Sequence, residues 1–198
     1  MMGLERMGPL LWVGIWGLLL LGCADLPLKG KAEIPGAAYI GHVEHIVVPF
    51  FPDDTDQCGP ATLASVMTYW GIPSSPQALR EEIYLPRLGG TLPIDLLLAA
   101  QAHGLRAEFY SGSLDNMRAE VKAGYPLVAF LNLGYTIFPR GHYVVITGFD
   151  DARQGVYVHS GLGRDVFVPY AQFLRSWEKM GRWTLLVFPD PAQGKAHT

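Results

Sequence analysis

The stretch QCGPATLASVMTYW, residues 57–70, decides the expected fold. Gly59 and Pro60 follow Cys58, and proline is tolerated in the first turn of a helix. The residues that follow are small or apolar on nearly every face, so we expect a largely buried central helix that ends near Gly71. Cys58 then lies at the helix N-terminus, where unpaired N–H groups and the helix dipole favour a thiolate. The stretch predicts Cys58 as a nucleophile with a depressed pKa; the alternative is a small buried apolar residue.

The sequence on both sides of this helix indicates an α+β domain. A short apolar run at 45–51 suggests a strand or an extended entry, and the polar loop at 52–56 follows it. Helical patterns come next and strand patterns come later, an order typical of α+β folds. The expected helices cover 76–84, 93–103, 114–123 (capped by Ser113) and 171–179, and the expected strands cover 106–110, 126–133, 142–149, 155–160, 165–169 and 183–189.

Length and composition restrict the class of protein. The chain has 198 residues, of which 49% are apolar and 17% charged, enough for one packed domain and unlike a disordered chain. A net charge of −3 provides no basic surplus for nucleic acid. Two cysteines cannot build a disulfide scaffold, a four-cysteine zinc site or an iron–sulfur cluster. Asp53, Asp54 and Asp56 lack EF-hand spacing, so we expect a solvated loop and no metal or organic cofactor.

The N-terminus has the pattern of an export signal. Arg6 precedes an apolar run from Leu10 to Leu21, which is too short to span a bilayer comfortably. The run ends in Leu-Leu-Gly-Cys at 20–23, which resembles the bacterial lipobox and implies cleavage before a lipidated Cys23. The alternatives are an uncleaved anchor and a buried hydrophobic helix.

We therefore expect an exported bacterial lipoprotein that is membrane-anchored and faces the periplasm. The expected division is a signal peptide at 1–22, a lipidated N-terminus and tether at 23–42, one domain at 43–190 and a polar tail at 191–198.

A thiol nucleophile needs a base, and the chain offers six histidines. His142 stands at the start of an apolar strand, just after Gly141, where an exposed strand end can meet a helix N-terminus. His159 lies inside a strand and is expected to be half-exposed. His142 is therefore the candidate base.

Three segments together resemble a known family. QCGPATLASVM, GHYVVITGFDD and GVYVHSGLGRDVFVPYAQFLRSW are similar to the papain-like, double-glycine (bacteriocin-processing) cysteine peptidases, and more closely to their stand-alone bacterial lipoprotein branch. The resemblance covers residues 43–189. It implies a papain-like fold, with a helical part that carries the nucleophile helix packed on a C-terminal antiparallel sheet. It also implies Cys58 as nucleophile, His142 as base, and an oxyanion site built from the backbone N–H of Cys58 and a glutamine side chain.

Two positions depart from that family's pattern. The family places its oxyanion glutamine six residues before the cysteine, where this chain has Pro52, so Gln57 is the nearest candidate amide. The family's third triad residue is an Asp at the end of the next strand, where this chain has Ser160. Ser160 is the candidate that orients His142; water or a backbone carbonyl are the alternatives.

Two functions follow from these residues. The first is a membrane-tethered thiol peptidase that cleaves peptides or proteins through a Cys58 acyl-enzyme. The second is a catalytically degraded peptide- or protein-binding module on the same fold, suggested by the missing Asp and the displaced glutamine. The sequence does not fix the oligomeric state.

Overall fold

The computed structural model describes residues 43–135 and 137–190. The expected signal peptide, Cys23, the tether and the polar tail lie outside the described residues. The elements, in chain order, are β1 (Val43–His45), α1 (Cys58–Tyr69), α2 (Pro76–Ile83), α3 (Pro93–Ala102), β2 (Leu105–Ser111), α4 (Leu114–Lys122), β3 (Leu127–Asn132), β4 (Gly141–Asp150), β5 (Gly155–Ser160), β6 (Gly163–Pro169), α5 (Tyr170–Glu178) and β7 (Trp183–Pro189).

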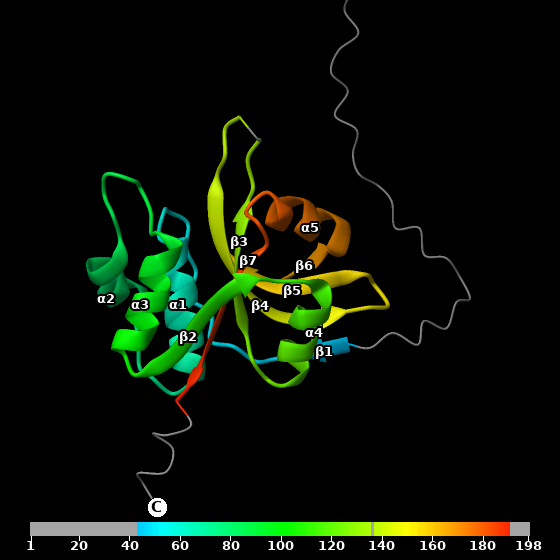
Figure 1. Cartoon of the computed structure of the whole chain (residues 1–198), viewed down its shortest axis with the longest axis horizontal. Helices are drawn as coiled ribbons and strands as arrows, with labels where there is room; N and C mark the ends of the chain where they lie inside the picture. The colour runs from blue at the N-terminus through cyan, green and yellow to red at the C-terminus, as the bar shows by residue number, and fades with distance from the viewer. Residues whose placement is uncertain (1–42, 136, 191–198) are drawn as a thin grey trace, which may run out of the picture. The chain divides into compact units, whose positions relative to one another are not determined.

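One antiparallel sheet forms the centre of the domain (Figure 1). Its order is β2-β7-β3-β4-β5-β6, and β1 pairs with β4 in addition. Three helices, α1 to α3, gather on one side of the sheet, and α4 and α5 lie on the other (Figure 1). The expected α+β class and antiparallel sheet are confirmed.

Of the two forms expected for residues 45–51, a strand or an extended entry, the strand does not continue beyond His45. Only Val43–His45 forms a strand, and the apolar residues 46–51 run on without strand pairing. The amide of Ile46 still donates to the carbonyl of Thr147 at 2.7 Å, and Val48 is buried. The segment therefore packs through its side chains while it leads the chain toward α1.

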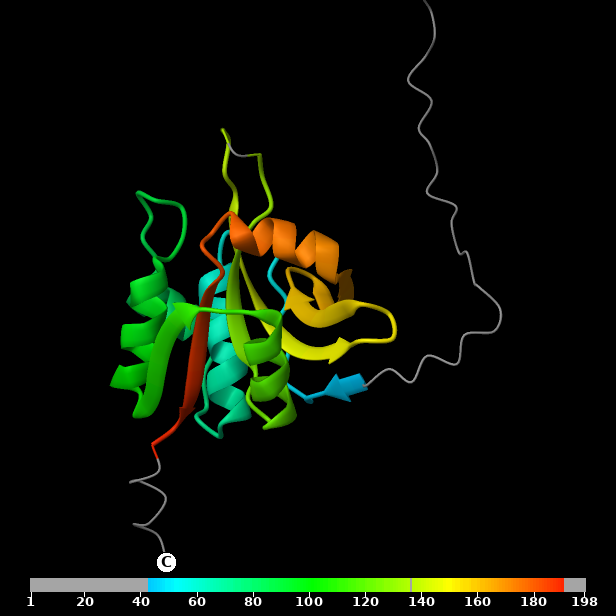
Figure 2. The same cartoon turned by 45° about the vertical axis from the view of Figure 1, so that its right-hand side comes forward.

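The expected burial of α1 is confirmed. Every residue from Gly59 to Met67 is buried, and the helix contains no charged residue. α1 packs against β4 and, on its other faces, against α2 and α3 (Figure 2). Because a helix that is apolar all round needs cover on every side, these neighbours fix its position relative to β4.

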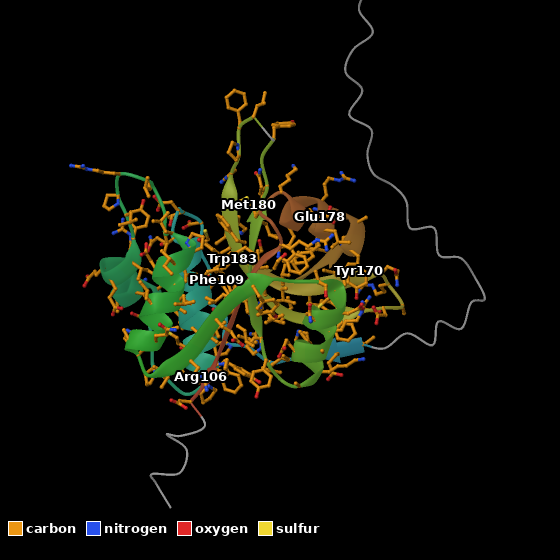
Figure 3. All side chains as sticks on the ribbon, in the orientation of Figure 1. Arg106, Phe109, Tyr170, Glu178, Met180 and Trp183 are labelled. Carbon is orange, nitrogen blue, oxygen red and sulfur yellow. The ribbon has the colours of Figure 1, made fainter. Side chains whose placement is uncertain are left out.

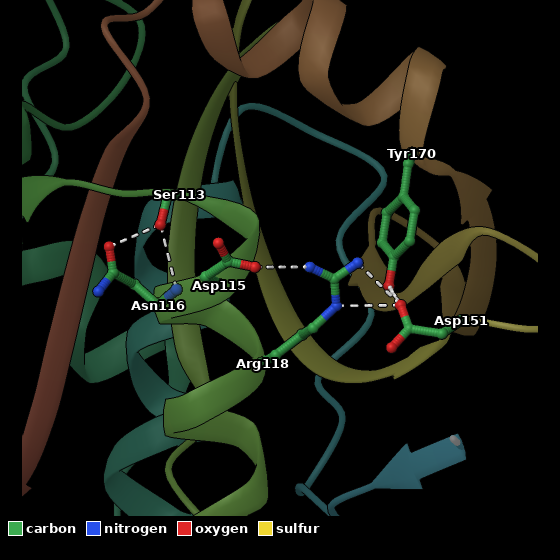
Figure 4. Close-up of polar contacts among 6 residues, drawn as sticks. All are labelled: Ser113, Asp115, Asn116, Arg118, Asp151 and Tyr170. Carbon is green, nitrogen blue, oxygen red and sulfur yellow. Dashed lines mark hydrogen bonds and ion pairs between the residues drawn. The ribbon is translucent and has the colours of Figure 1, made fainter. Parts of the chain in front are cut away.

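A polar network joins α4 to the β4–β5 turn and to α5 (Figure 4). The guanidinium of Arg118 binds Asp151 at 2.8 Å and Asp115 at 3.1 Å, and the hydroxyl of Tyr170 donates to Asp151 at 2.7 Å. The expected cap is also present, since Ser113 Oγ accepts the amide of Asn116 at 3.1 Å.

Stacked aromatic rings stabilise the β2–β7 edge of the sheet. Phe109 of β2 and Trp183 of β7 have ring centroids 6.2 Å apart and nearly parallel planes (Figure 3). The Nε1 of Trp177 in α5 also donates to the carbonyl of Trp183 at 3.0 Å.

Among the described residues, no helix is long and apolar enough to cross a membrane.

Candidate active site

Cys58 and His142 line the same cavity. It has a volume of about 480 Å³ and lies between the start of α1, the loop that leads into α3 and the start of β4. Cys58 is a free, partly exposed cysteine and the first residue of α1. The structure thus brings the predicted nucleophile and the predicted base together. The lining residues are Thr55, Asp56, Cys58, Leu88, Gly89, Gly90, Thr91, Leu92, Phe130, Arg140, Gly141, His142 and Tyr143.

The strand register explains how His142 meets Ser160. Val145 of β4 lies opposite His159 of β5, and the two strands are antiparallel. One step forward along β5, to Ser160, therefore corresponds to one step back along β4, to Val144. His142 lies two residues further along β4, and diagonal neighbours on antiparallel strands are within reach of long side chains. The Nε2 atom of His142 lies 3.0 Å from Ser160 Oγ. Ser160 therefore contacts Nε2 of the imidazole and does not contact Nδ1.

A glycine after the nucleophile lets the α3 loop approach α1. A Cβ on Gly59 would stand 2.9 Å from the Cβ of Thr91, closer than real Cβ atoms come. Thr91 is also the acceptor, through its carbonyl, for the hydroxyl of Tyr143 at 3.1 Å. Gly59 thus allows the cavity wall to pack directly on the first turn of α1.

The expected depression of the Cys58 pKa is wrong. Burial raises the pKa of this thiol above its ordinary value, and the negative charge of Asp53 raises it further. Hydrogen bonds from the backbone of Tyr143, Gly59 and Cys58 itself lower the pKa and offset part of that effect. The helix N-terminus does supply donors, but the loss of water around the sulfur outweighs them.

Burial and the charge of Asp53 also change the pKa of His142, together with the charge of Arg140. Burial lowers the pKa of its imidazole, Asp53 raises it, and Arg140 lowers it again. The raised thiol pKa and the lowered imidazole pKa both favour the uncharged form of each group. This differs from the thiolate that the helix position suggested.

Asp53 is the residue that sequence reasoning missed. It is only partly exposed and lines a small hollow together with Cys58, Ser160 and Gly161. Its amide donates to the carbonyl of Gly161 at 3.0 Å, and Gly161 adopts a left-handed φ of 57° just after β5. The expectation of a solvated loop therefore fails at Asp53 and holds at its exposed neighbours Asp54 and Asp56.

Gln57 is not brought into the cavity. Its Nε2 donates to the hydroxyl of Thr55 at 3.2 Å, and the residue is absent from the cavity lining. Its backbone caps α1 without a side-chain hydrogen bond to the helix. In this arrangement the glutamine amide stabilises its own loop.

His159 is buried, not half-exposed. Its side chain is 3% exposed, its Nε2 lies 3.0 Å from the carbonyl of Val48, and its Nδ1 accepts the amide of Asp165 at 3.1 Å. Both nitrogens of a neutral ring are thereby satisfied, and burial lowers the pKa of this imidazole. His159 anchors the entry segment to β5. Within residues 43–135 and 137–190, no group of three His, Cys, Asp or Glu could hold a metal ion.

Solved structures share this fold. A double glycine motif protease from an AMS/PCAT transporter, in complex with the leader peptide, is 23% identical with a TM-score of 0.59, over 74% of this chain and 95% of that one. A putative C39-like peptidase from Bacillus anthracis is 23% identical with a TM-score of 0.61, over 74% and 98%. The peptidase domain of Streptococcus ComA, a bi-functional ABC transporter, is 21% identical with a TM-score of 0.59, over 74% and 100%.

No curated protein matches the sequence significantly. The model of one family does match, over residues 43–185, which is most of the chain. The match spans every element from β1 to the first residues of β7, and so includes Cys58, His142 and Ser160. The chain belongs to the Peptidase_C39 like family.

Proposed function

We propose that this chain is a thiol peptidase in which Cys58 is the nucleophile and His142 is the general base. The observation that carries the proposal is that both residues line one cavity while Ser160 Oγ contacts the Nε2 atom of His142. Membership in a family of cysteine peptidases supports this chemistry. Neither a metal nor an organic cofactor takes part in it.

An uncharged thiol and an uncharged imidazole define the order of proton transfers in this proposal. A neutral His142 that donates its Nε2 proton to Ser160 Oγ keeps Nδ1 free to accept the thiol proton. As Sγ of Cys58 attacks the peptide carbonyl, its proton passes to Nδ1, and the carbonyl oxygen becomes an oxyanion. His142 then gives that proton to the leaving amine as the C–N bond breaks. A water molecule, deprotonated by His142, attacks the thioester, releases the acid and restores the thiol.

Backbone amides at the start of α1 supply the oxyanion site in this proposal. The N–H of Cys58 is one donor, and the backbone hydrogen bonds around the sulfur already lower the pKa of the thiol, although burial outweighs them. Gln57 as the second donor remains a prediction, and it requires the amide to leave Thr55 when substrate binds.

The substrate in this proposal is a peptide or an exposed protein segment. A relative of the same fold is described in complex with a leader peptide. The N-terminal sequence supports an exported lipoprotein tethered to a bacterial membrane through Cys23 and facing the periplasm. The stand-alone lipoprotein branch of the family is the group to which we assign the chain on these grounds.

Hydrolysis of a peptide library by variants of the full chain tests the peptidase proposal. We expect cleavage by the natural protein and none by Cys58→Ala or His142→Ala. His103→Ala is the matched control, because His103 is a surface histidine paired with Glu82 at 3.1 Å, and it should cleave normally. Full cleavage by Cys58→Ala would refute the proposal.

A binding module without catalysis is the second candidate. It is favoured by the raised pKa of Cys58 and by a hydroxyl where the family resemblance implies a carboxylate. This candidate predicts that the natural protein and Cys58→Ala retain the same peptides with equal affinity, and that neither cleaves them.

A further inference from the structure

Two loops border the cavity. One joins α2 to α3 and has the sequence YLPRLGGTL, residues 84–92; the other joins β3 to β4 and has the sequence LGYTIFPR, residues 133–140. Both project from the same end of the domain in two views (Figures 1 and 2). Both also contribute to the cavity lining, the first through residues 88–92 and the second through Arg140. We call them the mouth loops.

The mouth loops expose large apolar side chains. Ile137 is 80% exposed, Tyr135 is 79% and Phe138 is 74% in one loop, and Leu88 is 64% exposed in the other. Half of the large apolar residues that are exposed in the described part of the chain lie in these two loops: Leu85, Leu88, Leu92, Leu133, Tyr135, Ile137 and Phe138. Clusters of exposed apolar side chains mark surfaces that another molecule covers.

The apolar side chains of the second mouth loop do not serve the cavity. Tyr135, Ile137 and Phe138 are absent from its lining, although Arg140 at the base of the same loop is part of it. They belong to the loop between β3 and β4, which projects from the domain (Figure 1). An extended peptide needs a groove to cover its side chains, whereas a projecting apolar tip suits a fluid apolar phase.

The charges of the mouth loops are all positive. Each loop contains one arginine, Arg87 or Arg140, and neither loop contains an acidic residue, in a chain whose net charge is −3. Lys179 adds a third cation, because its Nζ donates to the carbonyl of Gly134 at 3.0 Å. Apolar tips with cations beside them match the boundary of a bilayer, where tyrosine lies at headgroup level and basic side chains meet anionic phosphates.

We propose that the two mouth loops insert into the surface of a bilayer that contains anionic phospholipid, and that this docking holds the cavity mouth at the membrane surface. The apolar tips enter the acyl boundary, and Arg87, Arg140 and Lys179 contact the headgroup phosphates. This docking requires neither the lipid on Cys23 nor the peptidase chemistry. Its occupant is lipid, and a protein or peptide on the same surface is a competing outcome.

A dye at the loop tip tests the docking directly. The full chain carries Cys23→Ser and Cys58→Ser, together with Ile137→Cys labelled with an NBD fluorophore. The matched control carries the dye on Val47→Cys, because Val47 is 73% exposed and follows β1, a strand that lies away from the mouth loops (Figure 1). Thermal melts confirm that each labelled protein is folded. The probes are vesicles of phosphatidylcholine alone and vesicles of phosphatidylcholine with phosphatidylglycerol.

We expect the dye at position 137 to shift to the blue and brighten with the anionic vesicles, and the dye at position 47 to stay unchanged. Arg87→Ala or Arg140→Ala should each weaken that response about fivefold, the effect of one basic residue near an anionic surface. No response at position 137, or equal responses at both positions, would overturn the proposal. So would a response at position 137 to a peptide library in the absence of vesicles, which would assign the surface to a peptide.

Discussion

The Nε2 atom of His142 lies 3.0 Å from the hydroxyl oxygen of Ser160. A hydroxyl thus contacts the imidazole at the position where the family resemblance implies a carboxylate. Because a hydroxyl has no charge, it orients the imidazole without stabilising the imidazolium, and burial lowers the pKa of His142. Together with the raised pKa of Cys58, this favours an uncharged thiol and an uncharged imidazole.

Ser160→Asp should restore the missing charge. A carboxylate within ~4–6 Å of an imidazole raises its pKa by about 1 to 3, so the pKa of His142 should rise by that amount. NMR titration of the His142 ring measures the change. Equal pKa values in Ser160→Asp and Ser160→Ala would show that position 160 does not act on His142.

Ser160→Ala should slow peptide cleavage without abolishing it. A neutral hydrogen bond contributes ~1 kcal/mol, which corresponds to a loss of about fivefold to tenfold in kcat with KM unchanged. Loss of an orienting carboxylate in serine proteases costs about 10⁴, so a loss of that size here would mean that Ser160 does more than hold the ring. Steady-state kinetics on one cleaved peptide decide between these sizes.

Asp53→Asn should make the thiol more reactive. Removing this charge lowers the pKa of Cys58, because Asp53 opposes the thiolate, and it also lowers the pKa of His142, because Asp53 favours the imidazolium. Alkylation of Cys58 by iodoacetamide should therefore begin at a lower pH than in the natural protein. Asp54→Asn is the matched control, since Asp54 is the exposed neighbour, and it should leave the alkylation profile in place. Identical alkylation profiles for the two variants would show that the charge of Asp53 does not act on Cys58.

Gly59→Ala should destabilise the domain by about 1 to 3 kcal/mol, the usual cost of overpacking. Its Cβ would meet Thr91 at 2.9 Å, so the cavity wall must move. Gly90→Ala is the control, because a Cβ there has nothing within 4 Å, and surface changes of that kind stay within about 0.5 kcal/mol. Chemical denaturation of both variants measures the difference. Equal stabilities would contradict the close packing of α1 on the α3 loop.

Several helices and strands could be predicted because the residues that mark their ends lie within or next to each element. Proline at helix starts, glycine after helix ends and runs of β-branched residues mark α2, α3 and β4 close to their observed bounds. Sequence alone leaves the entry segment open between a strand and an extended entry, because residues 46–51 are apolar for packing without being paired as a strand.

The roles of the site residues depend on contacts that no local pattern contains. Cys58 and His142 could be predicted as candidates because a helix start and a strand start are readable positions. Asp53 was missed because its link to Gly161 joins segments far apart in the sequence. The direction of the Cys58 pKa was missed because the dipole of a helix can be read from its start, whereas burial of the sulfur depends on the whole fold.

Labelling of the folded full chain with a peptide-based, thiol-reactive electrophile tests the central claim most directly, with the modified residue mapped by mass spectrometry. We expect the natural protein to be labelled at Cys58, and His142→Ala to be labelled there far more slowly while its unfolded form reacts normally. A natural protein that stays unlabelled when folded, and reacts at Cys58 only after unfolding, would show that Cys58 is a packed structural residue.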